Sequence, residues 1–351
     1  MDTLTHALSG ALLARATAPS PSPDALPLGR RVALGFFAAA SPDLDVIASW
    51  ISPLAYLYYH RGITHSLLML PLWAFVLAWL CALLWRGDRG WRAYFGVIAL
   101  GIGSHIAGDW ITSFGTMMLA PFSDTRFKLS TTFIIDLWFT GIILAGLMLS
   151  LAWRKSRAPA ALAVVALAAY VAFQFSLQQR ALEFAEAYAQ SAGLKQAKVS
   201  AMPRPVSPFN WMVVVDEGER YHYALISLSR REIPPQPTAE TGFIARLAAP
   251  YLPLDRAIWV GAERYGPQQQ AALAREALQQ PQLAFFRWFA EYPALYRIDS
   301  GNPSTCIWFQ DLRFLTPGRN AWPFRYGLCR EGVGSWAAYE LNGDNKRLPV
   351  Y

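Results

Sequence analysis

The chain has 351 residues, of which 54% are hydrophobic and only 16% charged, with fourteen Trp and a formal net charge of +7. This composition is more typical of a membrane protein than of an ordinary soluble protein. A pI of about 9.4 would also suit a nucleic-acid-binding protein. However, Lys and Arg cluster in short loops between apolar runs, without a basic stripe of interleaved aromatics, so we expect a lipid bilayer as partner and no nucleic acid.

The polarity of the sequence changes near residue 178. Residues 1–178 contain no Glu and only eight Asp, whereas Glu183 begins a stretch of ordinary soluble polarity with repeated Pro and Gln. We therefore expect a mainly α fold: a polytopic helical transmembrane domain over residues 1–178 and a smaller soluble α+β domain over residues 179–351.

Residues 3–16 predict a short helix whose small residues allow close packing against other membrane helices. Asp2 and His6 are four positions apart, so on a helix they share a face. The alternative is that Asp2 only stabilises the positive N-terminal end of this helix. At 14 residues the segment is too short to span a bilayer, and it could be a re-entrant or buried half-helix.

A Pro- and Ser-rich loop separates this helix from a second short apolar segment, residues 32–40. This segment ends at Ser41-Pro42-Asp43-Leu44-Asp45. Ser, Pro and Asp in this order match a helix N-cap and first turn, which would account for Asp43 without a ligand role. Capping explains Asp45 less well.

The stretch Tyr58-Tyr59-His60-Arg61-Gly62-Ile63-Thr64-His65-Ser66 contains two of only five histidines, directly before a long apolar run. Neutral imidazoles are strong ligands for transition metals. Gly62 frees the backbone between the two rings, so we expect His60 in a loop and Thr64 or His65 at the start of the next helix. The alternative is a pair of interfacial histidines at the mouth of a membrane span.

Residues 67–85 are nineteen uncharged residues, about 28 Å of helix, which is enough to cross the hydrocarbon core. Further spans are predicted at about residues 93–113, 133–153 and 159–177. Within the second span His105 and Asp109 are four apart and face one way. Function is the default explanation for ionisable groups inside a span, with a structural hydrogen-bonded pair as the alternative. Asp136 is predicted one turn inside the third span.

The C-terminal part predicts a polar helix leaving the membrane at residues 179–192, a β-hairpin and a small α+β domain. A disulfide between Cys306 and Cys329 is allowed only in an oxidising compartment. The remaining expected elements are the hairpin strands 211–215 and 221–228, a helix at 267–280, and strands at 306–314, 324–329 and 336–341.

Nine of the twelve Lys and Arg of residues 1–178 form three clusters, near residues 15–31, 86–92 and 154–157. If these loops are cytoplasmic, the positive-inside rule places the His and Asp residues together at the opposite, periplasmic face, together with the C-terminal domain. The His and Asp positions were not used in this assignment. Their convergence is therefore an independent indication of a shared site.

Such a set of imidazoles and carboxylates, without a thiolate, could hold one to three divalent ions. Zn is favoured, with Mn or Fe as alternatives. Some Asp would fix a His tautomer rather than bind the ion. Such a centre delivers hydroxide near neutral pH, and Arg61 could hold an anionic group such as a phosphate.

These motifs resemble the membrane-bound, metal-dependent hydrolases of the YdjM type. The resemblance covers about the first 140 residues and rests on seven stretches: 1–6, Pro42-Asp43-Leu44-Asp45, 60–66, His105-Ile106-Ala107-Gly108-Asp109, 112–116, 121–123 and Ile134-Ile135-Asp136. It implies an inner-membrane protein with a metal site. The residues it implies as ligands are Asp2, His6, Asp43, Asp45, His60, His65, His105, Asp109 and Asp136, and we expect Arg61 and Asp109 to take part in catalysis.

Our leading hypothesis is therefore a metal-dependent hydrolase acting at the membrane face on a phosphoester or a lipid headgroup. The first alternative is a non-catalytic membrane protein with a structural metal and a partner-binding soluble domain. The second is a transporter with an intramembrane proton path, which fits less well because the polar groups gather at one face.

Overall fold

The structure is a computed structural model that describes residues 1–20, 22, 25–85, 89–238, 240–301, 304–317, 323–332, 334–343 and 345–350. Arg86, part of one predicted basic cluster, lies outside the described residues. The chain forms two compact units. The first, called the helical unit, comprises Met1–Ile51 and Tyr58–Ser176, and the second, called the sheet unit, comprises Ser52–Leu57 and Leu177–Tyr351.

Helices make up the first unit, with a 3₁₀ segment after α2 and a 3₁₀ turn before α4. The helix α3 (Pro53–Tyr59) begins in Ser52–Leu57, which belongs to the sheet unit. The other elements are α1 (Thr3–Ala16), α2 (Leu28–Ala40), η1 (Ser41–Trp50), η2 (Ile63–His65), α4 (Leu70–Leu84), α5 (Arg92–Trp110), α6 (Leu137–Ala152) and α7 (Ala158–Ser191). The last of these continues into the sheet unit.

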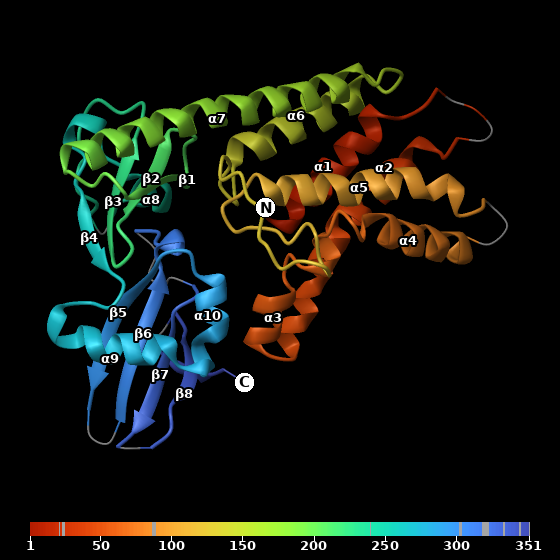
Figure 1. Ribbon diagram of the computed structural model, residues 1–351. Coiled ribbons are helices and arrows are strands. Elements are labelled where there is room, and N and C mark those ends of the chain that lie inside the picture. The colour runs from red at the N-terminus through yellow and green to blue at the C-terminus, as the bar shows by residue number, and fades with distance from the viewer. Residues whose placement is uncertain are drawn as a thin grey trace. The chain divides into compact units, whose positions relative to one another are not determined.

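Small residues allow α1, α2 and α5 to pack side by side (Figure 1). A Cβ added at Gly10 of α1 would overlap the backbone carbonyl of Gly35 in α2, and one added at Gly35 would overlap Gly10. Gly101 of α5 faces the same place, because a Cβ added there would lie 3.0 Å from the Gly35 oxygen. This close approach is the use of small residues expected for membrane helices, and it holds α1, α2 and α5 together.

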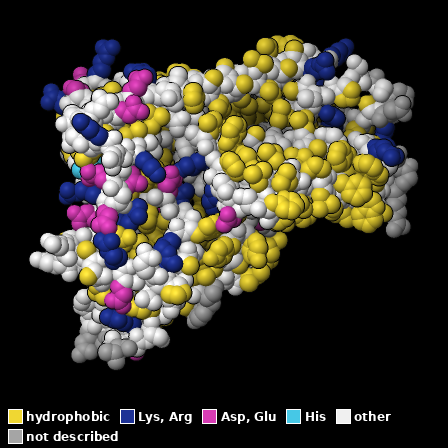
Figure 2. Space-filling view, viewed as in Figure 1, with side chains coloured by type: hydrophobic (Ala, Val, Ile, Leu, Met, Phe, Trp, Pro, Cys, Tyr) yellow, Lys and Arg dark blue, Asp and Glu magenta, His cyan; other side chains and the backbone are white. Residues whose placement is uncertain are grey.

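Among the described residues, two helical segments are long and apolar enough to cross a membrane. These are Leu28–Trp50, with 23 residues, and Ala158–Ser191, with 34. A third crossing is possible if Pro53–His65 and Leu70–Leu84, which are bent by 83° relative to each other, form one broken span. Figure 2 shows hydrophobic side chains covering the region of α4 and α5, as expected for lipid-facing helices.

Several predicted spans need correction. The prediction of a nineteen-residue span at 67–85 is wrong about where the helix starts: α4 begins at Leu70 and has 15 residues, about 22 Å. The segment predicted to be too short at 32–40 continues through η1, because the Ser41-Pro42-Asp43 sequence extends the helix as 3₁₀ turns instead of capping a new one. The helix α6 begins only at Leu137 and is shorter than a span.

The polar helix predicted at 179–192 is not a separate element. It forms the C-terminal part of α7, and the whole of α7 has 34 residues and is about 51 Å long. Ala181, Ala185 and Ala189 recur at intervals of four and are buried against the first sheet of the sheet unit. One face of this half is therefore apolar in spite of its polar composition.

The sheet unit has two antiparallel sheets, of order β1-β2-β3-β4 and β5-β6-β7-β8-β9. The predicted hairpin and the strands near residues 306–341 are confirmed. The elements are β1 (Lys198–Pro203), β2 (Asn210–Asp216), β3 (Arg220–Ser227), α8 (Phe243–Ala248), η3 (Leu254–Arg256), β4 (Val260–Glu263), α9 (Gln268–Gln279), η4 (Pro281–Leu283), α10 (Ala284–Phe289), β5 (Pro293–Ser300), β6 (Ser304–Asp311), η5 (Leu312–Phe314), β7 (Tyr326–Glu331), β8 (Ala337–Leu341) and β9 (Arg347–Pro349).

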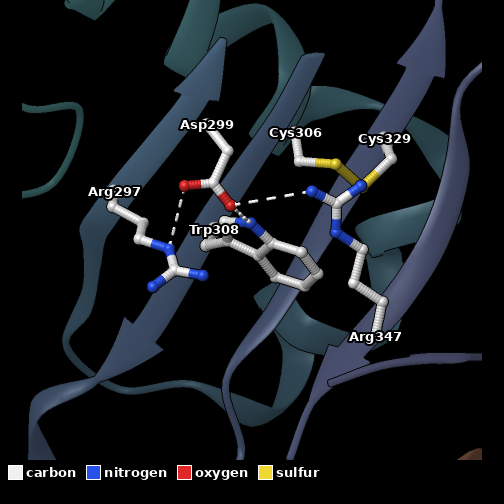
Figure 3. The surroundings of a disulfide bond; sticks show 6 residues. All are labelled: Arg297, Asp299, Cys306, Trp308, Cys329 and Arg347. Carbon is white, nitrogen blue, oxygen red and sulfur yellow. Dashed lines mark hydrogen bonds and ion pairs between the residues drawn. A yellow bond between two sulfur atoms is a disulfide. The ribbon is translucent and has the colours of Figure 1, made fainter. Parts of the chain in front are cut away.

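A disulfide joins the second sheet across β6 and β7. Cys306 and Cys329 are directly paired in the strand register and are both buried. The carboxylate of Asp299 lies close by, accepting a hydrogen bond from Trp308 Nε1 at 2.9 Å and pairing with Arg297 at 3.0 Å (Figure 3). The disulfide that the sequence allowed is therefore present.

We expect Cys306→Ser to lower the free energy of unfolding of the sheet unit by about 3 kcal/mol. The bond links residues 23 apart and limits the entropy of the unfolded chain accordingly. Denaturant unfolding followed by near-ultraviolet circular dichroism measures the loss, with Cys81→Ser, which removes the free cysteine of α4, as control. Equal stability of Cys306→Ser and Cys81→Ser would contradict the assignment.

Candidate metal centre

Three histidines that are far apart in the sequence meet inside the helical unit. His6 lies on α1, His65 ends η2, and His105 lies on α5. The rings of His6 and His105 stack with centroids 3.7 Å apart, and those of His65 and His105 are 4.7 Å apart. All three side chains are fully buried. The predicted convergence of these residues is thus present.

Hydrogen bonds fix which nitrogen of two of these rings faces the centre. Nδ1 of His105 lies 2.6 Å from the Ala39 carbonyl oxygen, which can only accept, so Nδ1 carries the proton. Nδ1 of His65 lies 2.9 Å from Thr64 Oγ1 and 3.4 Å from Asp45 Oδ2. Protonation at Nδ1 therefore leaves Nε2 of each ring as a lone-pair donor, the arrangement usual for ligating histidines.

The two Nε2 atoms lie only 2.9 Å apart. Asp43 Oδ1 is 3.7 Å from Nε2 of His65 and 3.5 Å from that of His105. Asp109 Oδ2 lies 3.4 Å and 3.6 Å from the same two nitrogens. A tetrahedral Zn site with bonds of about 2.0–2.1 Å separates its ligand atoms by about 3.3 Å. The four atoms therefore have the size and donor types of a site for one divalent ion.

Asp109 differs from Asp43 in its surroundings. Its Oδ2 lies 2.9 Å from Arg61 Nε, and its Oδ1 lies 3.0 Å from His6 Nε2 and accepts from the amino group of Met1. These groups already compensate the Asp109 charge. The group of His65, His105 and Asp43, whose ligand atoms all lie within 4.8 Å of one another, can hold an ion without it.

A second group of possible ligands adjoins the first through Asp43. Asp43, Asp45 and His60 also offer atoms within 4.8 Å of one another. Oδ1 of Asp45 lies 3.0 Å from Nδ1 of His60 and so fixes this ring. Oδ2 of Asp45 accepts from the backbone N–H of Arg61 at 3.2 Å and from the Thr64 hydroxyl. With Asp43 shared between the two groups, these ligand atoms are close enough to one another to hold a second ion.

The scan against known families finds a match to the YdjM inner membrane protein family over residues 1–181. The chain belongs to this family. The match covers α1 and most of α7 and so includes every residue of the three ligand groups, of which the third is His6, His105 and Asp109. Searches of curated proteins and of solved structures found no match. Membership in the YdjM family identifies an inner membrane protein, in agreement with its apolar helices.

The two remaining residues that the YdjM resemblance implied as ligands act as helix caps. Asp2 is the N-cap of α1 and accepts from the N–H and hydroxyl of Thr5. Asp136 was predicted one turn inside its helix but is the N-cap of α6, accepting from the N–H groups of Trp138 and Phe139. Neither belongs to the ligand groups found among the described residues. For Asp2 the capping alternative describes its contacts.

Local backbone geometry also differs from the prediction. Arg61, not Gly62, takes the left-handed conformation, with φ 60°. Gly62 is needed for space instead, because an added Cβ would lie 2.9 Å from the Tyr59 oxygen. His60 lies in a turn as predicted, but His65 ends η2 rather than opening α4, so four residues separate it from the next helix.

Sequence reasoning missed several polar residues that hold the site. The hydroxyl of Thr3 donates to Asp43 Oδ2 at 2.6 Å, and that of Thr112 accepts from Arg61 Nη1 at 2.8 Å. Thr112 follows Asp109 by three residues, a spacing that could have indicated it. Outside the ligand groups, Gln174 donates to Asp136, the N-cap of α6, at 2.8 Å; a single polar residue in an apolar segment does not indicate such a contact.

Proposed function

We propose that this chain is a membrane-bound hydrolase whose metal ion is held by Asp43, His65 and His105. The single observation that carries the proposal is the meeting of two Nδ1-anchored histidines and a carboxylate at ligand distances. The donor set favours Zn, with Mn or Fe as alternatives. The chemistry that such an ion supplies is a water molecule ionised near neutral pH.

Two histidines and one carboxylate leave a coordination position open, which distinguishes catalytic from structural zinc sites. The side chains of His65 and His105 have no exposure. The side chain of Asp43 is 12% exposed, and that of His60 is 14% exposed. Water and substrate would therefore reach the centre from the side of Asp43 and His60. The buried side is closed by His6, Arg61 and Asp109.

Arg61 is given a different role from the one that the sequence suggested. Its side chain is 2% exposed, pairs with Asp109, donates to Thr112, and lies 4.8 Å from the centre of the Phe114 ring. A guanidinium so enclosed is poorly placed to receive a substrate anion. We propose that it holds Asp109, and that Asp109 in turn orients His6.

The substrate class that fits is a phosphoester, either soluble or part of a lipid headgroup, presented at the periplasmic membrane face. The basic loops favour this orientation by the positive-inside rule. The disulfide of the sheet unit supports it, because such bonds persist in oxidising compartments.

The proposal is tested by hydrolysis of bis(4-nitrophenyl) phosphate and of phosphatidylglycerol by the full-length protein in detergent. We expect activity that a chelator removes and Zn, Mn or Fe(II) restores. His65→Ala should lower it by more than about 100-fold, the upper end of what loss of a supporting residue costs. The matched control is His222→Ala in the sheet unit, whose ring pairs with Glu217. Activity that survives chelation and His65→Ala would contradict the proposal.

One observation favours a non-catalytic alternative. If Asp109 joins Asp43, His65 and His105, four protein atoms complete a tetrahedron and no position remains for water, as in structural zinc sites. Asp109→Asn separates the two functions. In the hydrolase the metal stays bound to this variant, whereas a closed structural site releases it.

A further inference from the structure

A second polar site lies at the other end of the helical unit. His6 is near the start of α1 and Arg15 near its end, whereas α5 begins at Arg92 and carries His105 in its last turns. Thirteen residues of α5 correspond to about 20 Å of helix. The basic residues of the loops therefore gather well away from the candidate metal centre.

These residues surround a cavity of about 880 Å³. Its cations come from three parts of the sequence that are far apart: the end of α1 with the start of α2, the residues just before α5, and the α6–α7 turn. Figure 2 shows Lys and Arg side chains near that turn. The cations that line the cavity are Arg15, Arg31, Arg89, Arg154, Lys155 and Arg157.

Several of these side chains are held in place by backbone carbonyls. Arg15, which is 7% exposed, donates to the carbonyls of Arg154 and Ser156 at 2.9 and 2.5 Å. Arg31 donates to the Ala14 carbonyl at 3.0 Å, and Arg157 to that of Ala18 at 3.3 Å. To orient a protein in the membrane by the positive-inside rule, Lys and Arg need only lie in a loop and need no fixed position. Converging and fixed guanidinium groups are what an anion-binding site needs.

The charge balance of the cavity points the same way. Among the described residues that line it there is no Asp or Glu. Asp24 and Asp88, in the adjoining loops, lie outside the described residues. Arg15, Arg31, Arg154, Lys155 and Arg157 bring positive charge to one cavity, and this charge attracts an anion.

We propose that this cavity binds the headgroup of an anionic phospholipid in the inner leaflet. It lies where the apolar helices α2, α6 and α7 end or begin, which is the depth of lipid phosphates. Basic pockets between membrane helices on this side are suited to headgroups that carry one or two phosphates. The site is separate from the proposed hydrolase centre and does not depend on it.

The test measures binding of phosphatidylglycerol, cardiolipin and phosphatidylcholine to the full-length protein by native mass spectrometry and by the shift in unfolding temperature. We expect both anionic lipids to bind and stabilise, and phosphatidylcholine not to. The double variant Lys155→Gln/Arg157→Gln, both residues being exposed, should weaken anionic-lipid binding about thirtyfold, at about 1 kcal/mol per cation. Arg180→Gln, an exposed arginine of α7 away from the cavity, should bind as wild type does.

Other outcomes overturn the proposal. Equal binding of all three lipids, or wild-type affinity in the double variant, would show that the cavity does not select anionic headgroups. Stabilisation by inorganic phosphate or ATP as strong as that by the lipids would assign the cavity to a soluble anion. Metal content and the unfolding temperature in phosphatidylcholine, measured on the same samples, show whether the double variant is folded and keep this test independent of the hydrolase proposal.

Discussion

Full-length protein with His105→Ala is expected to lose its divalent metal. Nε2 of His105 lies within 3.6 Å of Nε2 of His65, Oδ1 of Asp43 and Oδ2 of Asp109. Nδ1 of the same ring is fixed by the Ala39 carbonyl. Removing it takes away a ligand rather than a supporting residue. The affinity should therefore fall by more than about 100-fold. Inductively coupled plasma mass spectrometry of purified protein measures the metal per chain.

Two companion variants make this result specific. His6→Ala removes a ring that contacts Asp109 and stacks on His105, so it should retain metal with affinity lowered about 10- to 100-fold. His222→Ala, in the sheet unit, should bind metal as wild type does. Retention of full metal content by His105→Ala would show that the cluster is not the binding site.

Arg61→Gln is expected to destabilise the helical unit by about 3–5 kcal/mol, the usual cost of leaving one charge of a buried pair without its partner. The carboxylate left behind is that of Asp109, which has no exposure and lies 2.9 Å from Arg61 Nε; its Oδ1 keeps the Met1 amino group, but its Oδ2 loses its cation. The unfolding temperature in detergent, compared with that of Arg180→Gln, measures the loss.

A double variant tests the cause of this loss. In Arg61→Gln/Asp109→Asn the buried negative charge is removed together with its partner, so part of the stability should return. If the double variant is as unstable as the sum of the two single variants, the pair is not coupled. The destabilisation would then come from the lost packing of Arg61 against Phe114.

The sequence carried more information about the site than about the membrane topology. His and Asp at spacings of four, and ionisable groups at the ends of apolar segments, predicted which residues meet, because such groups are costly in a membrane unless they share partners. Spacing alone could not separate a cap from a ligand. The sequence allowed both Asp2 and Asp43 to be helix caps. Asp2 is the N-cap of α1, whereas Asp43 lies within η1 beside two histidines.

The span predictions failed where local chemistry allowed two continuations. Ser41-Pro42-Asp43 is compatible with a cap and also with 3₁₀ turns that prolong a helix, and packing against α5 and η2 accompanies the second outcome. Before α4 begins at Leu70, the hydroxyl of Ser66 donates to the carbonyls of Met118 and Ala120 and ties the segment to them. Contacts to residues more than fifty positions away have no signature in the local pattern.

The central claim is that Nε2 of His65 and Nε2 of His105 bind one metal ion together. Anomalous diffraction from crystals of the full-length protein, recorded on both sides of the zinc absorption edge, tests it most directly. The account predicts an anomalous peak about 2 Å from both nitrogens and from Asp43 Oδ1. Crystals grown with zinc that show no peak between these two rings would contradict it.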